Sequence, residues 1–114
     1  MSGSNFLQWE AVWLADDSLP NRGVGALIGQ QQVAVFRTGD DQFYALDNHD
    51  PFSGANVLAR GILGSVGDKR VVASPIYKQH FCLEDGACIE DDSVSLQVWP
   101  VRQRDGVVEV GCSA

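Results

Sequence analysis

The sequence predicts an all-β fold, a small antiparallel β-sandwich or barrel. Short runs of β-branched and aromatic residues recur along the chain and are separated by turn residues. The 114 residues include 12 glycines and 4 prolines, which indicates many tight connections. No segment keeps the apolar period of an amphipathic helix. We therefore expect one domain over residues 1–114, in which residues 1–5 form a flexible start.

The first half of the chain predicts a run of strands connected by hairpins. Strands are expected at residues 6–14, 24–28, 33–37 and 42–46. Residues 16–20 predict a turn, in which Asp16 would cap one helical turn. Polar residues and glycines at 29–32 and 39–41 predict the hairpin connections. The β-branched and aromatic run at 33–37 predicts a buried strand.

The second half of the chain predicts further short strands. They are expected at residues 70–73, 80–83, 87–89, 96–101 and 107–110. The segment 56–64 does not alternate cleanly between apolar and polar residues, and we expect short strand pieces broken by Gly61 and Gly64. Asp105-Gly106, between the last two strands, is the strongest hairpin signal in the chain.

Two proline-containing loops interrupt this pattern, at residues 50–55 and 74–81. Each begins with a polar residue followed by proline and leaves a predicted strand, so the two loops can face each other at one end of a small sheet. Twenty-one residues separate Phe52 from Ser74, a spacing that would splay the loops or cover them with residues 57–64. Loops held at the end of a rigid sheet are where binding residues concentrate.

The two loops resemble those of the Rieske-type ferredoxin domain. There, Cys-Pro-His-x-Gly-Ala and Cys-Pro-x-His-Gly hold a [2Fe–2S] cluster through two Cys and two His. In this sequence Asp50 and Ser74 stand at the two Cys positions, and Phe52 and Tyr77 stand at the two His positions. The framework residues that match are Pro51, Gly54, Ala55 and Pro75. The resemblance implies an all-β fold of the Rieske iron–sulfur type.

The same four positions argue against the cluster. Phe52 offers no lone pair, and the oxygen atoms of Asp50, Ser74 and Tyr77 favour harder metals than cluster iron. We therefore expect no cofactor-binding residue and no metal-binding residue in this chain.

A longer resemblance covers nearly the whole sequence. The strings that carry it are Val35-Phe36-Arg37, Asp47-Asn48, Asp50-Pro51-Phe52, Ser74-Pro75-Ile76-Tyr77-Lys78-Gln79-His80-Phe81 and Asp105-Gly106-Val107-Val108. With these strings the chain resembles the small subunit of the assimilatory NAD(P)H-dependent nitrite reductase. The resemblance implies a partner, the large subunit, which carries FAD, siroheme and a [4Fe–4S] cluster and reduces nitrite to ammonium. This chain would be an accessory subunit without catalytic residues of its own.

The charge of the chain limits which classes of partner it can bind. The formal net charge is −7 and the pI is about 4.5, whereas binding to nucleic acid or to an anionic membrane surface needs a basic patch. No basic segment followed by an apolar run opens the sequence, and no apolar run is long enough to span a bilayer. We expect a cytoplasmic protein that binds neither nucleic acid nor membrane.

The loops supply the candidate partner-binding residues. These are His49, Pro51, Ser53, Lys78, Gln79 and His80. The sequence leaves two orientations possible for the aromatic side chains of Phe52 and Tyr77. They fill the space that a cluster would occupy, or they point outward to a partner. We favour the inward position for Phe52.

Other readings of the sequence have less support. His49 beside Asp50 lacks a nucleophile or an orienting third group. His80, Cys82 and Cys88 are three loosely spaced candidate ligands, short of a zinc site. Two alternative functions are an electron carrier with an unusual ligand set and a regulatory binding module of another oxidoreductase.

Overall fold

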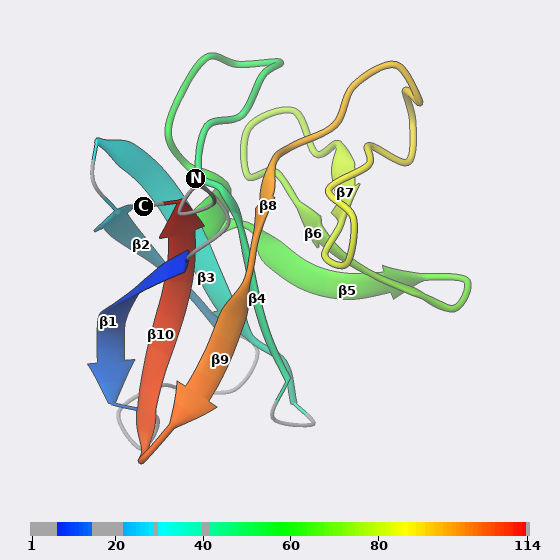
Figure 1. The fold of residues 1–114 in the computed structure, drawn as a ribbon. Coiled ribbons are helices and arrows are strands. Elements are labelled where there is room, and N and C mark those ends of the chain that lie inside the picture. The colour runs from blue at the N-terminus through cyan, green and yellow to red at the C-terminus, as the bar shows by residue number, and fades with distance from the viewer. Residues whose placement is uncertain (1–6, 15–21, 29, 40–41, 114) are drawn as a thin grey trace, which may run out of the picture.

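The computed structural model describes residues 7–14, 22–28, 30–39 and 42–113, and these form an antiparallel all-β fold (Figure 1). The elements are β1 (Leu7–Leu14), β2 (Arg22–Ile28), β3 (Gln31–Arg37), β4 (Phe43–Asp47), the 3-10 helix η3 (Leu58–Arg60), β5 (Ile62–Val66), β6 (Lys69–Ala73), β7 (His80–Cys82), β8 (Val98–Trp99), β9 (Val101–Arg104) and β10 (Val107–Ser113). Each pair of neighbouring strands runs antiparallel. The fold class predicted from the sequence is confirmed.

The strands form three sheets, with the orders β1-β10-β9, β2-β3-β4-β8 and β5-β6-β7. Figure 1 shows the sheet of β5, β6 and β7 set beside the other two sheets. The first loop, residues 50–55, follows β4, and the second loop, residues 74–79, connects β6 to β7. The two loops therefore leave strands of two different sheets.

Strand β3 is buried on both faces, because each face belongs to a different hydrophobic cluster. Val33 and Val35 pack in one cluster with Val108 and Val110 of β10. Ala34 and Phe36 point to the opposite face, since side chains alternate along a strand. There the second cluster joins β3 to β6, β7 and η3, through residues that include Val72, Phe81 and Leu58. The second cluster lies beneath the two loops and fixes the sheets from which they leave.

The structure corrects three of the predicted elements. Residues 58–60 form a 3-10 helix, and β5 then runs through Gly64, which pairs with Val71 of β6. Pairing with β6 along the whole of β5 overrides the weak strand propensity of glycine. The predicted strand at 87–89 is also wrong: Cys88 makes only an isolated bridge to Phe81. The single strand predicted at 96–101 is wrong as well: β8 and β9 are separate strands that belong to different sheets. The remaining predicted strands are confirmed with altered bounds, and the predictions for residues 1–5 and 16–20 lie outside the described residues.

Candidate functional site

The first loop is closed by two backbone hydrogen bonds that begin and end at Asp50. The amide of Asp50 donates to the carbonyl of Ala55 at 2.8 Å, and the amide of Gly54 donates to the carbonyl of Asp50 at 2.8 Å. Gly54 has a φ of +77°, a left-handed conformation that glycine adopts without steric cost. The result is a tight turn with its first residue buried.

The second loop repeats this pattern position by position. The amide of Ser74 donates to the carbonyl of Gln79 at 2.9 Å, and the amide of Lys78 donates to the carbonyl of Ser74 at 3.1 Å. Lys78 stands at the position that Gly54 has in the first loop, and its φ is +67°. The two loops are therefore copies of one backbone conformation, and their first residues are equivalent.

These two first residues bond directly to each other. The hydroxyl Oγ of Ser74 donates to Oδ2 of Asp50 at 2.5 Å, across 24 residues of sequence. The other carboxylate oxygen of Asp50, Oδ1, accepts from the amide of Phe52 at 2.9 Å. Asp50 is 0% exposed and Ser74 is 1% exposed, so the bond lies in the interior. We call the Asp50–Ser74 pair the loop clasp; it confirms that the loops face each other and excludes the splayed arrangement.

The loop clasp holds Asp50 in its charged form. Burial by itself raises the pKa of this carboxyl, because the charged form loses its hydration. Hydrogen bonds from Ser74, from the amide of Phe52 and from Ser53 act in the opposite direction and outweigh burial, so the pKa of Asp50 lies below its ordinary value. The carboxylate is thus a buried anion that is stabilised by hydrogen-bond donors of both loops.

The two aromatic residues of the loops differ in orientation. Phe52 is half-buried and packs on the second cluster, with its ring centroid 6.2 Å from that of Phe81. Tyr77 is 59% exposed and contributes to neither cluster. The inward position that we favoured for Phe52 is confirmed, whereas inward packing is wrong for Tyr77. Phe52 thus anchors the first loop on the core, and Tyr77 is available at the surface.

The residues present do not fit a [2Fe–2S] cluster. The positions of the two thiolate ligands hold Asp50 and Ser74, which are already bonded to each other. The positions of the two imidazole ligands hold Phe52, which has no donor atom, and Tyr77, which is mostly exposed to solvent. Among the described residues, no group of three or more His, Cys, Asp or Glu side chains could hold a metal ion.

Asn48 holds the first loop in place, a role that sequence reasoning missed. This residue is buried, and its side-chain Nδ2 donates to Oε1 of Gln32 at 3.4 Å and to the carbonyl of Asn56 at 3.3 Å. Its Oδ1 accepts from the amide of Ala59 at 2.8 Å. One amide side chain therefore ties the loop to β3 and to η3. The sequence contained only an indirect signal, the Asp47-Asn48 string of the family resemblance.

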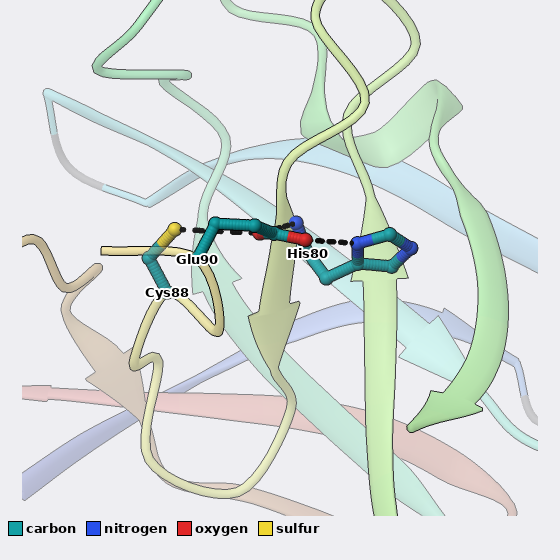
Figure 2. A network of polar contacts seen from close by, with 3 residues as sticks. All are labelled: His80, Cys88 and Glu90. Carbon is teal, nitrogen blue, oxygen red and sulfur yellow. Dashed lines mark hydrogen bonds and ion pairs between the residues drawn. The ribbon is translucent and has the colours of Figure 1, made fainter. Parts of the chain in front are cut away.

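The end of the second loop is tied to the following segment by Glu90. The carboxylate of Glu90 accepts from Nδ1 of His80 at 2.6 Å and from the backbone amide of His80 at 2.8 Å, and the thiol of Cys88 lies 3.7 Å from it (Figure 2). Burial raises the pKa of Glu90, but the hydrogen bonds from His80 outweigh it and lower that pKa overall. Nδ1 of His80 is therefore engaged in a contact within the chain.

The six candidate partner-binding residues fall into two groups. His49, Pro51 and Lys78 are exposed, and Nδ1 of His49 lies 3.1 Å from Oδ1 of Asn56. The other three are half-buried: Ser53 Oγ accepts from the amide of Ala55 at 3.3 Å, His80 bonds to Glu90, and Oε1 of Gln79 is buried and has no hydrogen-bond partner among the described residues. Sequence reasoning also omitted Ile76, which is 43% exposed beside Tyr77.

Comparison with known proteins places this site in a family. The model of the Rieske-like [2Fe-2S] domain matches residues 8–111. The nitrite reductase (NADH) small subunit of Escherichia coli is 44% identical over 104 residues, which cover 90% of this chain and 96% of that one. The chain belongs to the nitrite reductase small subunits of the Rieske-like family. The solved structure of the Escherichia coli protein NirD agrees: it is 42% identical with a TM-score of 0.88, over 96% of this chain and 100% of that one.

One further relative of this nitrite reductase small subunit has a different chain length. The nitrite reductase [NAD(P)H] large subunit of Klebsiella oxytoca is 45% identical over 103 residues. The match covers 90% of this chain and only 11% of that relative. A domain similar to this chain is therefore part of a much longer polypeptide in that organism. Among the described residues, no helix has the length and apolar character to cross a bilayer.

Proposed function

We propose that this chain is a non-catalytic accessory subunit that binds the large subunit of an NAD(P)H-dependent nitrite reductase. The large subunit would hold FAD, siroheme and a [4Fe–4S] cluster and reduce nitrite to ammonium in the cytoplasm, as part of nitrite assimilation. This chain would contribute contact surface and no redox centre. Its binding residues would lie on the two loops, among His49, Pro51, Ser53, Lys78, Gln79 and His80.

The observation that carries this proposal is the relative from Klebsiella oxytoca. There, a stretch 45% identical to this chain lies in the same polypeptide as the rest of a nitrite reductase large subunit. Two domains on one polypeptide are held at high effective concentration, so a contact between them is favoured even when it is weak. Where the two occur as separate chains, the same contact must hold them together by affinity alone.

The loop clasp supports a role by contact. Electron transfer through the loops would need a cluster between them, but Asp50 and Ser74 are engaged with each other and Phe52 occupies adjacent space. A rigid pair of loops with exposed tips loses little conformational entropy on binding. The alternative function as an electron carrier therefore lacks the thiolate and imidazole ligands that such a cluster needs, and no observation favours a regulatory role in another oxidoreductase.

Co-purification with the large subunit tests the proposal. The chain would be tagged and expressed together with the large subunit of the same organism, and nitrite-dependent oxidation of NADH and of NADPH would be measured with and without it. We expect a stable complex with higher or longer-lived activity than the large subunit alone. A large subunit that is fully active and never retains this chain would sink the proposal. Iron analysis of the recovered small chain, with two irons bound per chain, would revive the electron carrier.

A further inference from the structure

The tip of the second loop carries a lysine in a backbone conformation that suits glycine. Lys78 has a φ of +67°, and its equivalent in the first loop, Gly54, has a φ of +77°. The left-handed conformation is unfavourable for an L-amino acid because Cβ crowds the backbone. The second loop motif of Rieske-type ferredoxins, Cys-Pro-x-His-Gly, also has glycine here. The fold therefore gains nothing from the lysine at this position.

The side chain of Lys78 does not stabilise the chain either. It is exposed, and it makes no hydrogen bond or ion pair within the described residues. It is one of only two lysines in a chain with a net charge of −7. Strained non-glycine residues in loops concentrate at binding sites, where the strain is offset by a function elsewhere.

The neighbours of Lys78 are exposed apolar surface. Ile76 is 43% exposed and Tyr77 is 59% exposed. The turn that presents them is rigid, because the loop clasp and the backbone bonds of Ser74 fix its base. Tyrosine is one of the residue types enriched in binding hot spots, and exposed apolar surface around it favours burial against a partner.

We infer that Ile76, Tyr77 and Lys78 form the principal contact of this chain and that they bind an acidic, partly apolar surface of the large subunit. We call these three residues the contact tip. The inference deepens the proposed function and rests on it, since the partner is the same. The partner would place a carboxylate against the ammonium of Lys78 and an apolar hollow against Tyr77. This assignment moves the centre of the interface from both loops to the outer half of one.

Binding of purified variants to the immobilised large subunit tests the inference at low and at high salt. Lys78→Gly removes the charge and relieves the strained backbone, so its denaturation midpoint stays equal to that of the wild type or rises. We expect it to bind about tenfold more weakly than the wild type, with a weaker dependence on salt. Lys78→Arg keeps the charge and restores most of the affinity.

Two matched controls separate the effect of the charge of Lys78 on binding from the effect of its backbone strain. Lys69→Ala removes the other lysine, which is exposed at the start of β6, and leaves binding unchanged. Among the described residues, the other non-glycine residue with a positive φ is Asp105, at 53°. Asp105→Gly relieves the backbone strain there and leaves binding unchanged. Lys78→Gly that binds like the wild type, with the same salt dependence, overturns the contact tip and leaves the accessory function standing. A wild-type chain that does not bind at all overturns the accessory function itself.

Discussion

The first loop and the second loop share their backbone hydrogen bonds, but their side chains take opposite directions. At the third position, Phe52 packs on the core, whereas Ile76 is exposed. At the fifth position, Gly54 relaxes the turn, whereas Lys78 strains it. The first loop is thus adapted to the interior and the second to the surface. In a Rieske domain, a cluster would need equal contributions from both loops.

The difference shows how two similar loops can serve the interior and the surface separately. The loop clasp joins the two loops at the positions where a Rieske domain has thiolate ligands, through one buried, charge-assisted hydrogen bond. Because the first loop and the clasp hold the site together, the exposed tip of the second loop is not needed for that role. Substitutions in the buried part of the loops and in the exposed tip should therefore have different effects.

Breaking the loop clasp should have the largest effect. Asp50→Ala leaves the buried hydroxyl of Ser74 and the amide of Phe52 without their acceptor, which costs about 3 kcal/mol of unfolding free energy. Urea denaturation followed by tryptophan fluorescence measures the loss. Ser74→Ala should cost less, because the amide of Phe52 still reaches the carboxylate.

A double-mutant cycle tests whether the two residues act as a pair. The Asp50→Ala and Ser74→Ala changes combined should destabilise the chain by clearly less than the sum of the two single changes. Additive losses would mean that Asp50 stabilises only its own loop. The clasp would then not hold the two loops together.

The clasp should also give the fold a defined acid dependence. The pKa of Asp50 in the folded chain lies below its ordinary value of 3.8, so the charged carboxylate stabilises the fold fully above that value. This contribution is lost as the pH falls through the lowered pKa. The stability difference between the wild type and Asp50→Asn should be constant near neutral pH and shrink below about pH 4. A difference that grows on acidification would contradict the assignment of a lowered pKa.

The aromatic residues of the two loops should separate stability from binding. Phe52→Ala removes a half-buried ring from its contact with Phe81 and should cost about 2 kcal/mol of unfolding free energy. Tyr77→Ala should leave the denaturation midpoint unchanged, because the ring is 59% exposed, and should weaken binding to the large subunit. A loss of stability in Tyr77→Ala as large as that in Phe52→Ala would remove the distinction between the loops.

The sequence predicted the backbone of this site better than its side-chain directions. Proline, glycine and the spacing of apolar runs determine where turns occur, so the two facing loops were predictable. The direction of Tyr77 was not, because an aromatic side chain satisfies an interior and an interface equally well. The clasp was also missed: a hydrogen bond between Asp50 and Ser74 depends on the register of two sheets, which no local pattern contains.

Local patterns failed in a similar way between the loops. The segment 56–64 has no strand period, yet β5 forms because β6 is a well-anchored partner. The sequence assigned no structural role to Asn48, and only the folded chain shows that its amide satisfies three separate groups. The role of a polar residue that connects distant segments becomes evident only when the positions of those segments in the fold are known.

The equivalent fifth positions allow a smaller and cleaner test of backbone strain. Gly54→Ala places Cβ where no other atom lies within 4 Å, so the change acts through the φ of +77° alone. It should cost about 1 kcal/mol of unfolding free energy. Gly86→Ala is a useful contrast, because its Cβ would also collide with the carbonyl of Leu96 and the cost should be larger. Equal costs at the two glycines would show that the first loop is tighter than its surroundings suggest.

The smallest effect is expected where the second loop meets Glu90. The side chains of His80 and Glu90 are 37% and 46% exposed, so water and salt weaken the polar contact between them. Glu90→Gln should therefore cost at most about 0.5 kcal/mol of unfolding free energy. The lowered pKa of Glu90 means that the wild type loses this contribution as the pH falls below the ordinary value of 4.5. Chemical denaturation of both chains at neutral and acidic pH measures it. A cost comparable to that of Asp50→Ala would show that the outer half of the second loop also serves the fold, and would weaken the case that its tip is reserved for contact.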